Sequence, residues 1–408
     1  MGLTIRMDEL IAAIANSLDI VEAEIVGASV NHGKRIAVLC ALMGKKLGMS
    51  EEELKTLTVC ALFHDCALTE YILYLNAEYA VESLAPHCEA GQENIEMLPF
   101  DSDVSGIILY HHEQADGGGP FGKKEGEFPL AAELIAITDM LDIKHHLDKL
   151  PTENLPTLIK EIEERSGKCF TKTAAETLVS VLDEKTLISL RNENIGETAE
   201  KLIPKWFADI EGEAMMNLAR LVTKIIDYKS PFTRNHTHQI ANRAWLMSEY
   251  YEYNNHMRAK IFLAASLHDL GKLAIPNEIL DKPGKLTDSE FETIKGHVKG
   301  TYDLLSQITN FEEICKWASS HHEKLDGTGY WFGKKADELD FVDRMLACTD
   351  IYQAISEERP YHPARSHEET IELMKNMADK GFIDSGIVKD FDIAMAPYSL
   401  KKVPDPKI

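Results

Sequence analysis

"SLHDLGKLAIPNEILDKPGKLT", residues 266–287, ends an apolar run with His268 and Asp269 and then turns through Gly271 and Lys272 into a loop rich in Pro, Gly and Lys. Placing an imidazole and a carboxylate at the end of a buried helix costs free energy unless other groups compensate them. An ordinary polar cap is one explanation, and a bound cation is the other. The rest of the chain favours the cation.

The chain repeats this arrangement. The first half contains "ALFHDCAL", with His64 and Asp65. An upstream histidine precedes the His-Asp pair by 32 residues in both halves, from His32 to His64 and from His236 to His268. Further matches follow in the same order: His87 with His297, His111 and His112 with His321 and His322, and Asp139 with Asp350. The repeat predicts two copies of one domain, at residues 1–150 and 213–408, joined by a helical connector at 151–212.

Both copies have helical periodicity. Stretches such as "AEIVGASVNHGKRIAVLCALMGKKLG" and "AMMNLARLVTKIIDYK" place apolar residues three and four apart, and Gly and Pro lie between the periodic runs. Alternation of β-branched residues is scarce. We therefore expect an all-α protein made of two tandem helical bundles.

Composition excludes several classes of function. The 408 residues carry a formal net charge of −24, which disfavours binding to DNA, RNA or an anionic membrane surface. No apolar stretch approaches the roughly 20 residues that span a bilayer, and the acidic N-terminal pattern is not that of a signal peptide. The seven cysteines lack CxxC spacing, which fits a reducing cytoplasm.

Five histidines and two aspartates recur in each copy. A lone histidine on an apolar helix is more often a core residue than a ligand, but recurrence in order at matched spacing favours metal binding. Imidazole and carboxylate together suit iron, manganese, zinc or nickel, whereas magnesium and calcium prefer oxygen ligands. Seven ligands are too many for one ion and enough for two. An aspartate next to a histidine can bridge such a pair, which would activate a water and hold a phosphodiester.

The second copy resembles the HD-GYP branch of the HD phosphohydrolase superfamily over about residues 213–385. The matching motifs are "HDLGKLAIPNEIL", "HHEKLDGTGYWFGKK", "TDIYQAI" and "ERPYHP". The resemblance implies two HD-type bundles and a cyclic-dinucleotide phosphodiesterase. For such an enzyme the first expected substrate is cyclic di-GMP and the second is 3′,3′-cyclic GMP-AMP, and the expected product is a linear dinucleotide or GMP.

The resemblance also implies roles for individual residues. One metal ion would be surrounded by His236, His268, Asp269 and Asp350, and the other by His297, His321 and His322, with Asp269 as the bridge. Iron or manganese is favoured, with zinc and nickel as alternatives. Asp269 and Lys272 would be catalytic, and Lys272, Arg359 and Tyr330 would contact the substrate.

Two positions depart from the family pattern. Trp331 stands where the family has Pro in the Gly-Tyr-Pro signature, which bears on substrate identity. Some members bind a third ion through a Glu four residues before the first histidine. That position is Phe232, so we expect two ions.

The first copy keeps a full set of predicted ligands, namely His32, His64, Asp65, His87, His111, His112 and Asp139. It has Ala67 and Leu68 in place of the Gly-Lys pair. Three interpretations remain: a metal-loaded scaffold for regulation or homodimerisation, a second hydrolytic site, or a redox or oxygen-sensing centre, because Cys66 and Cys88 adjoin predicted ligands.

Other functions compete for the whole protein. One is a non-catalytic, metal-stabilised receptor for a nucleotide. The others are a different nucleotide phosphohydrolase and a di-iron oxygenase.

Overall fold

The computed structural model describes residues 3–25, 27–68, 84–227, 229–230, 236–282, 284–357, 364–398 and 402–406. Two residues singled out in the sequence, Phe232 and Arg359, lie outside the described residues. The chain divides into two compact units, one formed by Arg6–Phe207 and the other by Met1–Ile5 with Ala208–Ile408.

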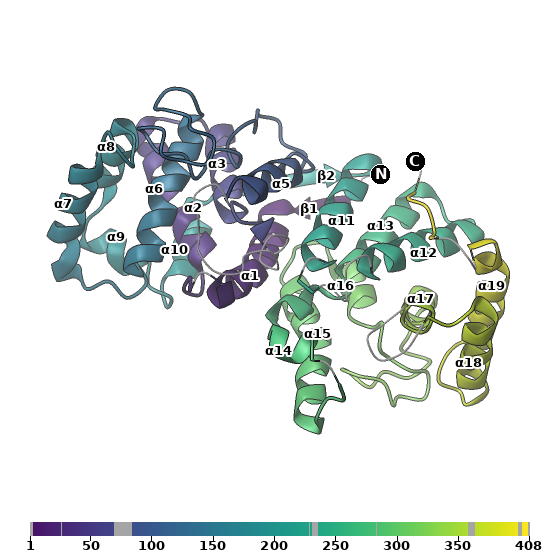
Figure 1. Ribbon diagram of the computed structural model, residues 1–408. Helices are drawn as coiled ribbons and strands as arrows, with labels where there is room; N and C mark the ends of the chain where they lie inside the picture. Colours follow the sequence, from purple (N-terminus) through teal and green to yellow (C-terminus); the bar gives the residue numbers. More distant parts are fainter. Residues whose placement is uncertain are drawn as a thin grey trace. The chain divides into compact units, whose positions relative to one another are not determined.

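Helices build the first unit (Figure 1). They are α1 (Met7–Ile25), α2 (His32–Leu47), α3 (Glu51–Leu62), α5 (Ala85–Ile95), α6 (Leu130–His145), the 3-10 helix η2 (Thr152–Asn154), α7 (Leu155–Arg165), α8 (Lys172–Val181), α9 (Glu184–Ser189) and α10 (Ile195–Leu202). Helix α2 is central, because α1, α3, α6, α8 and α10 all pack against it. Helices α8 and α10 come from the predicted connector, and they pack on the first unit.

The second unit repeats this plan. Its helices are α11 (Gly212–Asp227), α12 (His236–Tyr250), α13 (Asn255–Leu267), η3 (Leu270–Ala274), α14 (Asn277–Leu280), α15 (Asp288–Leu305), α16 (Glu312–Ala318), α17 (Phe341–Ser356), α18 (His367–Asp379), α19 (Ser385–Met395) and η4 (Ala396–Tyr398). Helix α12 is central and contacts α11, α13, α17 and α19.

The expected all-α class is confirmed. In the described part of the chain the exception is a two-stranded sheet of β1 (Leu3–Arg6) and β2 (Phe207–Ile210). None of the described helices combines the length and apolar character that crossing a membrane requires.

Glycines lie where the segment after each His-Asp pair meets a neighbouring helix. In the second unit, a Cβ on Gly271 would lie 2.1 Å from the carbonyl oxygen of His297 and 2.8 Å from the amide nitrogen of Thr301. In the first unit the small residue is on the opposite helix, since a Cβ on Gly91 would lie 2.8 Å from Ile108 Cγ2 and 4.0 Å from Ala67 Cβ. The second unit therefore needs a glycine where this segment meets α15, whereas in the first unit the close contact of Gly91 is with the Ile108 side chain.

We expect Gly271→Ala to destabilise the protein by on the order of 2–3 kcal/mol, because the added methyl group meets backbone atoms that must move. Gly296→Ala, on the helix α15 that Gly271 contacts, is the matched control. No described atom lies within 4 Å of a Cβ placed there, so this substitution should stabilise the helix by about 0.5–1 kcal/mol. Denaturant unfolding of the full chain measures both effects, and equal effects would contradict the packing argument.

Candidate metal centres

The same elements carry the predicted ligands in both units. The first histidine begins the central helix, as His32 in α2 and His236 in α12. The His-Asp pair follows α3 or α13, and the third histidine lies on α5 or α15. The paired histidines lie in a loop and the final aspartate on α6 or α17. Equivalent residues thus converge by equivalent routes.

The second unit brings its seven predicted ligands together in overlapping clusters. Ligand atoms lie within 4.8 Å of one another in three groups: His236 with His268 and Asp350, His268 with Asp269 and His321, and His297 with His321 and His322. The two oxygens of Asp269 point to different histidines. Oδ2 lies 3.0 Å from His268 Nε2, and Oδ1 lies 3.3 Å from His297 Nε2. Asp269 is therefore positioned as the predicted bridge requires.

Two imidazoles in this centre face each other through ring nitrogens that carry no hydrogen. His297 Nδ1 donates to the Ile294 carbonyl at 2.6 Å, and His321 Nδ1 donates to the Ala318 carbonyl at 2.8 Å. A carbonyl oxygen only accepts hydrogen bonds, so the neutral rings carry lone pairs on Nε2. These Nε2 atoms lie 3.2 Å apart. Burial lowers the pKa of both histidines to about 3, which keeps them neutral.

The donor set fits a divalent transition metal. The buried atoms His268 Nε2 and Asp269 Oδ1 have no hydrogen-bond partner among the described residues. Burial opposes ionisation of Asp269, yet His268 and Lys272 hold its pKa well below the usual range. The neutral imidazoles of His297 and His321 and the ionised carboxylate of Asp269 are in the protonation state that such ions require of their ligands.

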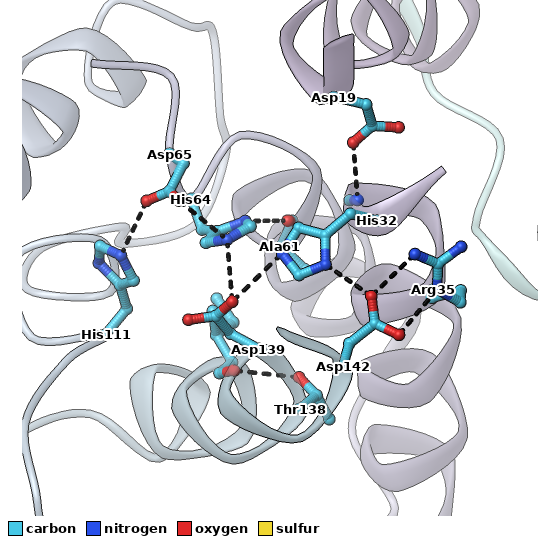
Figure 2. Close-up of polar contacts among 12 residues, drawn as sticks. Asp19, His32, Arg35, Ala61, His64, Asp65, His111, Thr138, Asp139 and Asp142 are labelled. Carbon is cyan, nitrogen blue, oxygen red and sulfur yellow. Dashed lines mark hydrogen bonds and ion pairs between the residues drawn. The ribbon is translucent and has the colours of Figure 1, made fainter. Parts of the chain in front are cut away.

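The first unit contains an equivalent centre (Figure 2). Asp65 Oδ1 lies 3.3 Å from His87 Nε2 and 3.4 Å from His111 Nε2. Asp139 Oδ1 lies 3.2 Å from His32 Nε2 and 3.7 Å from His64 Nε2. His112 lies at the edge, with Nδ1 3.9 Å from Asp139 Oδ2. All seven ligands predicted for this copy therefore come together as well.

The two centres differ in the group behind the first histidine. His32 Nδ1 lies 2.6 Å from Asp142 Oδ2, and Arg35 Nε donates to Asp142 Oδ1 at 2.8 Å (Figure 2). In the second unit Glu357 Oε2 takes this place, 2.7 Å from His236 Nδ1. Carboxylates behind ligand histidines set ring orientation and raise ligand basicity. The repeat predicted neither Asp142 nor Glu357, because these two carboxylates lie at different distances after the final aspartate of their copies.

Glu22 is a further carboxylate that the repeat did not reveal. It is buried on α1, and its Oε2 has no hydrogen-bond partner among the described residues. On the same face of α1, Asp19 accepts from the Gly33 amide at 2.9 Å, next to His32. Burial raises the pKa of Glu22 to about 8. Burial opposes protonation of His64, but Asp65, Asp139 and Glu22 raise the pKa of its imidazole to about 9.

A buried glutamate fastens the loop after the paired histidines in each unit. Glu113 accepts from the amides of Phe121 at 2.7 Å and Lys123 at 2.6 Å. Glu323 accepts equivalently from the amides of Phe332 at 2.7 Å and Lys334 at 2.9 Å. The shared "HHE" sequence was the available signal, since the glutamate recurs directly after the ligands.

The predicted substrate residues fall beside the second centre where they are described. Lys272 Nζ lies 2.5 Å from Asp269 Oδ2, and the Tyr330 ring lies 4.7 Å from the His322 ring between centroids. In the first unit Leu68 stands where Lys272 stands. It lines a cavity of about 360 Å³ that also contacts Asp65 and Asp139. At this position the first cavity has an apolar side chain where the second centre has a cation, and the lysine that lines the first cavity is Lys144 on α6.

The chain is similar to known proteins along most of its length. A family model described as "HD domain" matches residues 19–145 and 220–387, one match in each copy. The chain is 28% identical to a 3′3′-cGAMP-specific phosphodiesterase of Vibrio cholerae serotype O1 over 402 residues, which is 95% of this chain and 91% of that protein.

Two further similarities cover different parts of the chain. A cyclic di-GMP phosphodiesterase of Pseudomonas aeruginosa is 31% identical over 189 residues, 45% of this chain and 43% of that protein. The crystal structure of the V. cholerae cyclic GMP-AMP phosphodiesterase V-cGAP3 matches with a TM-score of 0.65 and 22% identity, over 96% of this chain and 98% of that one. The structural match shows a shared fold.

We expect Glu357→Gln to weaken metal retention in the second centre by about 10–100-fold, because the amide orients His236 less firmly and polarises it less. Competition against a chelator measures this loss. Ser356→Ala, the neighbouring position on the same segment, is the control and should retain metal like the unmodified protein. Unchanged retention in Glu357→Gln would show that the contact to His236 does not tune the site.

Proposed function

The chain belongs to the HD domain family, and from this we propose that it is a metal-dependent phosphodiesterase that hydrolyses a cyclic dinucleotide. The expected resemblance to HD phosphohydrolases is thereby confirmed. The proposal rests above all on Asp269, whose two oxygens face two histidine clusters. A carboxylate in this position suits a bridge between two divalent ions.

We propose that two ions bind in the second centre, held by the seven residues predicted from the sequence, and that they are iron or manganese. When bound, such ions supply Lewis acidity to phosphoryl oxygens and lower the pKa of a water molecule. The mixed imidazole and carboxylate donors support this choice over magnesium or calcium.

The residues around the centre would position the substrate. Lys272, beside Asp269, presents a positive charge to an approaching phosphate on a protein whose net charge is −24. The Tyr330 ring lies against His322 and offers a face for a nucleobase next to the ligands. Arg359 remains a predicted substrate contact.

Two cyclic dinucleotides are candidates. Cyclic di-GMP is supported by the HD-GYP motifs and by the relative from P. aeruginosa. For 3′3′-cGAMP the supporting observation is coverage, since the V. cholerae relative named for it matches 95% of this chain, whereas the cyclic di-GMP relative matches 45%. Because the match to this relative extends over both copies of the repeat, 3′3′-cGAMP should be tested as a substrate beside cyclic di-GMP.

We infer that the first copy binds metal without sharing this phosphate chemistry. Leu68 replaces the lysine, and the apolar residues that line the cavity beside Lys144 include Leu84, Met140 and Ile143. A scaffold role, in regulation or in a homodimer, is the proposal that these features support. The scattered cysteines, with no disulfide among the described residues, support a reducing cytoplasmic location.

We expect Asp269→Asn to lower kcat for cyclic dinucleotide hydrolysis by at least about 10²-fold, because the bridging charge is lost. Asp65→Asn in the first copy is the matched control and should retain activity. Chromatography of the products from cyclic di-GMP and 3′3′-cGAMP measures the rates. Metal-loaded protein that leaves both substrates intact would refute the proposed activity, and equal losses in both variants would refute the scaffold role.

A further inference from the structure

A thiol lies within the metal cluster of the first copy. The donor atoms of His87, Cys88, His111 and His112 all lie within 4.8 Å of one another. Cys88 is fully buried on α5, and its Sγ lies 3.7 Å from His87 Nε2. In the second copy Val298 follows the third histidine, so the equivalent cluster contains imidazoles without a thiol.

The spacing of these atoms suits coordination of one ion. With a zinc–sulfur bond of about 2.3 Å and a zinc–nitrogen bond of about 2.0–2.1 Å in tetrahedral geometry, sulfur and nitrogen ligands stand roughly 3.6 Å apart. The separation of Cys88 Sγ from His87 Nε2 is 3.7 Å. Three imidazoles and one sulfur also make up the four donors that a tetrahedral ion takes.

An independent observation points to a ligand at this position. His111 Nδ1 donates to the Ile108 carbonyl at 2.5 Å, which leaves its lone pair on Nε2. That Nε2 is buried and has no hydrogen-bond partner among the described residues. His111 therefore presents an uncompensated lone pair to the cluster that contains Cys88.

We propose that Cys88 Sγ is a metal ligand in the first copy, so that the two copies of this chain bind metal through different sets of donor atoms. The thiol proton passes to solvent when the ion binds, and the sulfur coordinates as a thiolate. A thiolate favours zinc or iron, whereas a site with imidazole and carboxylate ligands alone also accommodates manganese. This inference requires metal binding by the first copy, but it does not require that either copy hydrolyses a cyclic dinucleotide.

Cobalt substitution of the full chain tests the proposal, because a thiolate bound to Co²⁺ absorbs in the near ultraviolet by charge transfer and imidazole or carboxylate ligands do not. Metal-free protein is titrated with Co²⁺, and bound cobalt is quantified alongside the spectrum. We expect the unmodified protein to develop this band. We expect Cys88→Ser and Cys88→Val, which copies the second centre, to lose it.

Cys60→Ser is the control, since Cys60 is a buried thiol of the same unit outside the clusters. It should keep the band. Unmodified protein that binds cobalt without the band, or Cys88 variants that retain it, would overturn the proposal. Val298→Cys should add a second band of the same kind. Hydrolysis assays on the same samples report the proposed function separately.

Discussion

Imidazole rings held in one orientation are the constraint on which both centres depend. Each of five ligand histidines pairs Nδ1 with the carbonyl three residues earlier: His64, His111, His268, His297 and His321. The carbonyl belongs to the turn that precedes the histidine, so the ring is oriented by its own segment. Nε2 is then left to face the interior. Packing of the helices has only to bring these segments together.

The charge around those rings is distributed differently in the two units. In the first, Arg35 and Asp142 form a buried ion pair behind His32, and Glu22 adds another buried carboxylate. In the second, Glu357 contacts His236 Nδ1, and Lys272 reaches Asp269. A cationic side chain therefore lies beside Asp269 in the second unit, where the first unit has Leu68 at the matching position. Equivalent ligand sets are in this way placed in different electrostatic surroundings.

The sequence predicted the helical class and fourteen candidate ligand positions, which lie close together in each unit of the structure, because duplication at equal spacing is visible without a structure. Contacts that depend on how the helices pack could not be predicted from the sequence. Asp142 and Glu357 serve the same purpose at unequal distances from the final aspartate, so the repeat gives no signal for them. Glu22 lies on α1, where an isolated glutamate resembles any surface residue until packing shows that it is buried.

Glu113 and Glu323 have a consequence for how such a protein diversifies. Each binds main-chain amides, so most side chains in its loop do not affect the anchor; the exceptions are Gly119 and Gly329, where a Cβ would lie 2.5 Å from the Cα of the glutamate. The first loop has the sequence "DGGGPF", and the second has "DGTGYWF", which is one residue longer. In both loops the amides at the end donate to the glutamate in the same way. Side chains such as Trp331 can thus be replaced, which alters recognition, while the adjoining histidines keep their positions. Substitutions in the loop can therefore change which ligand is recognised without changing the histidine cluster next to it.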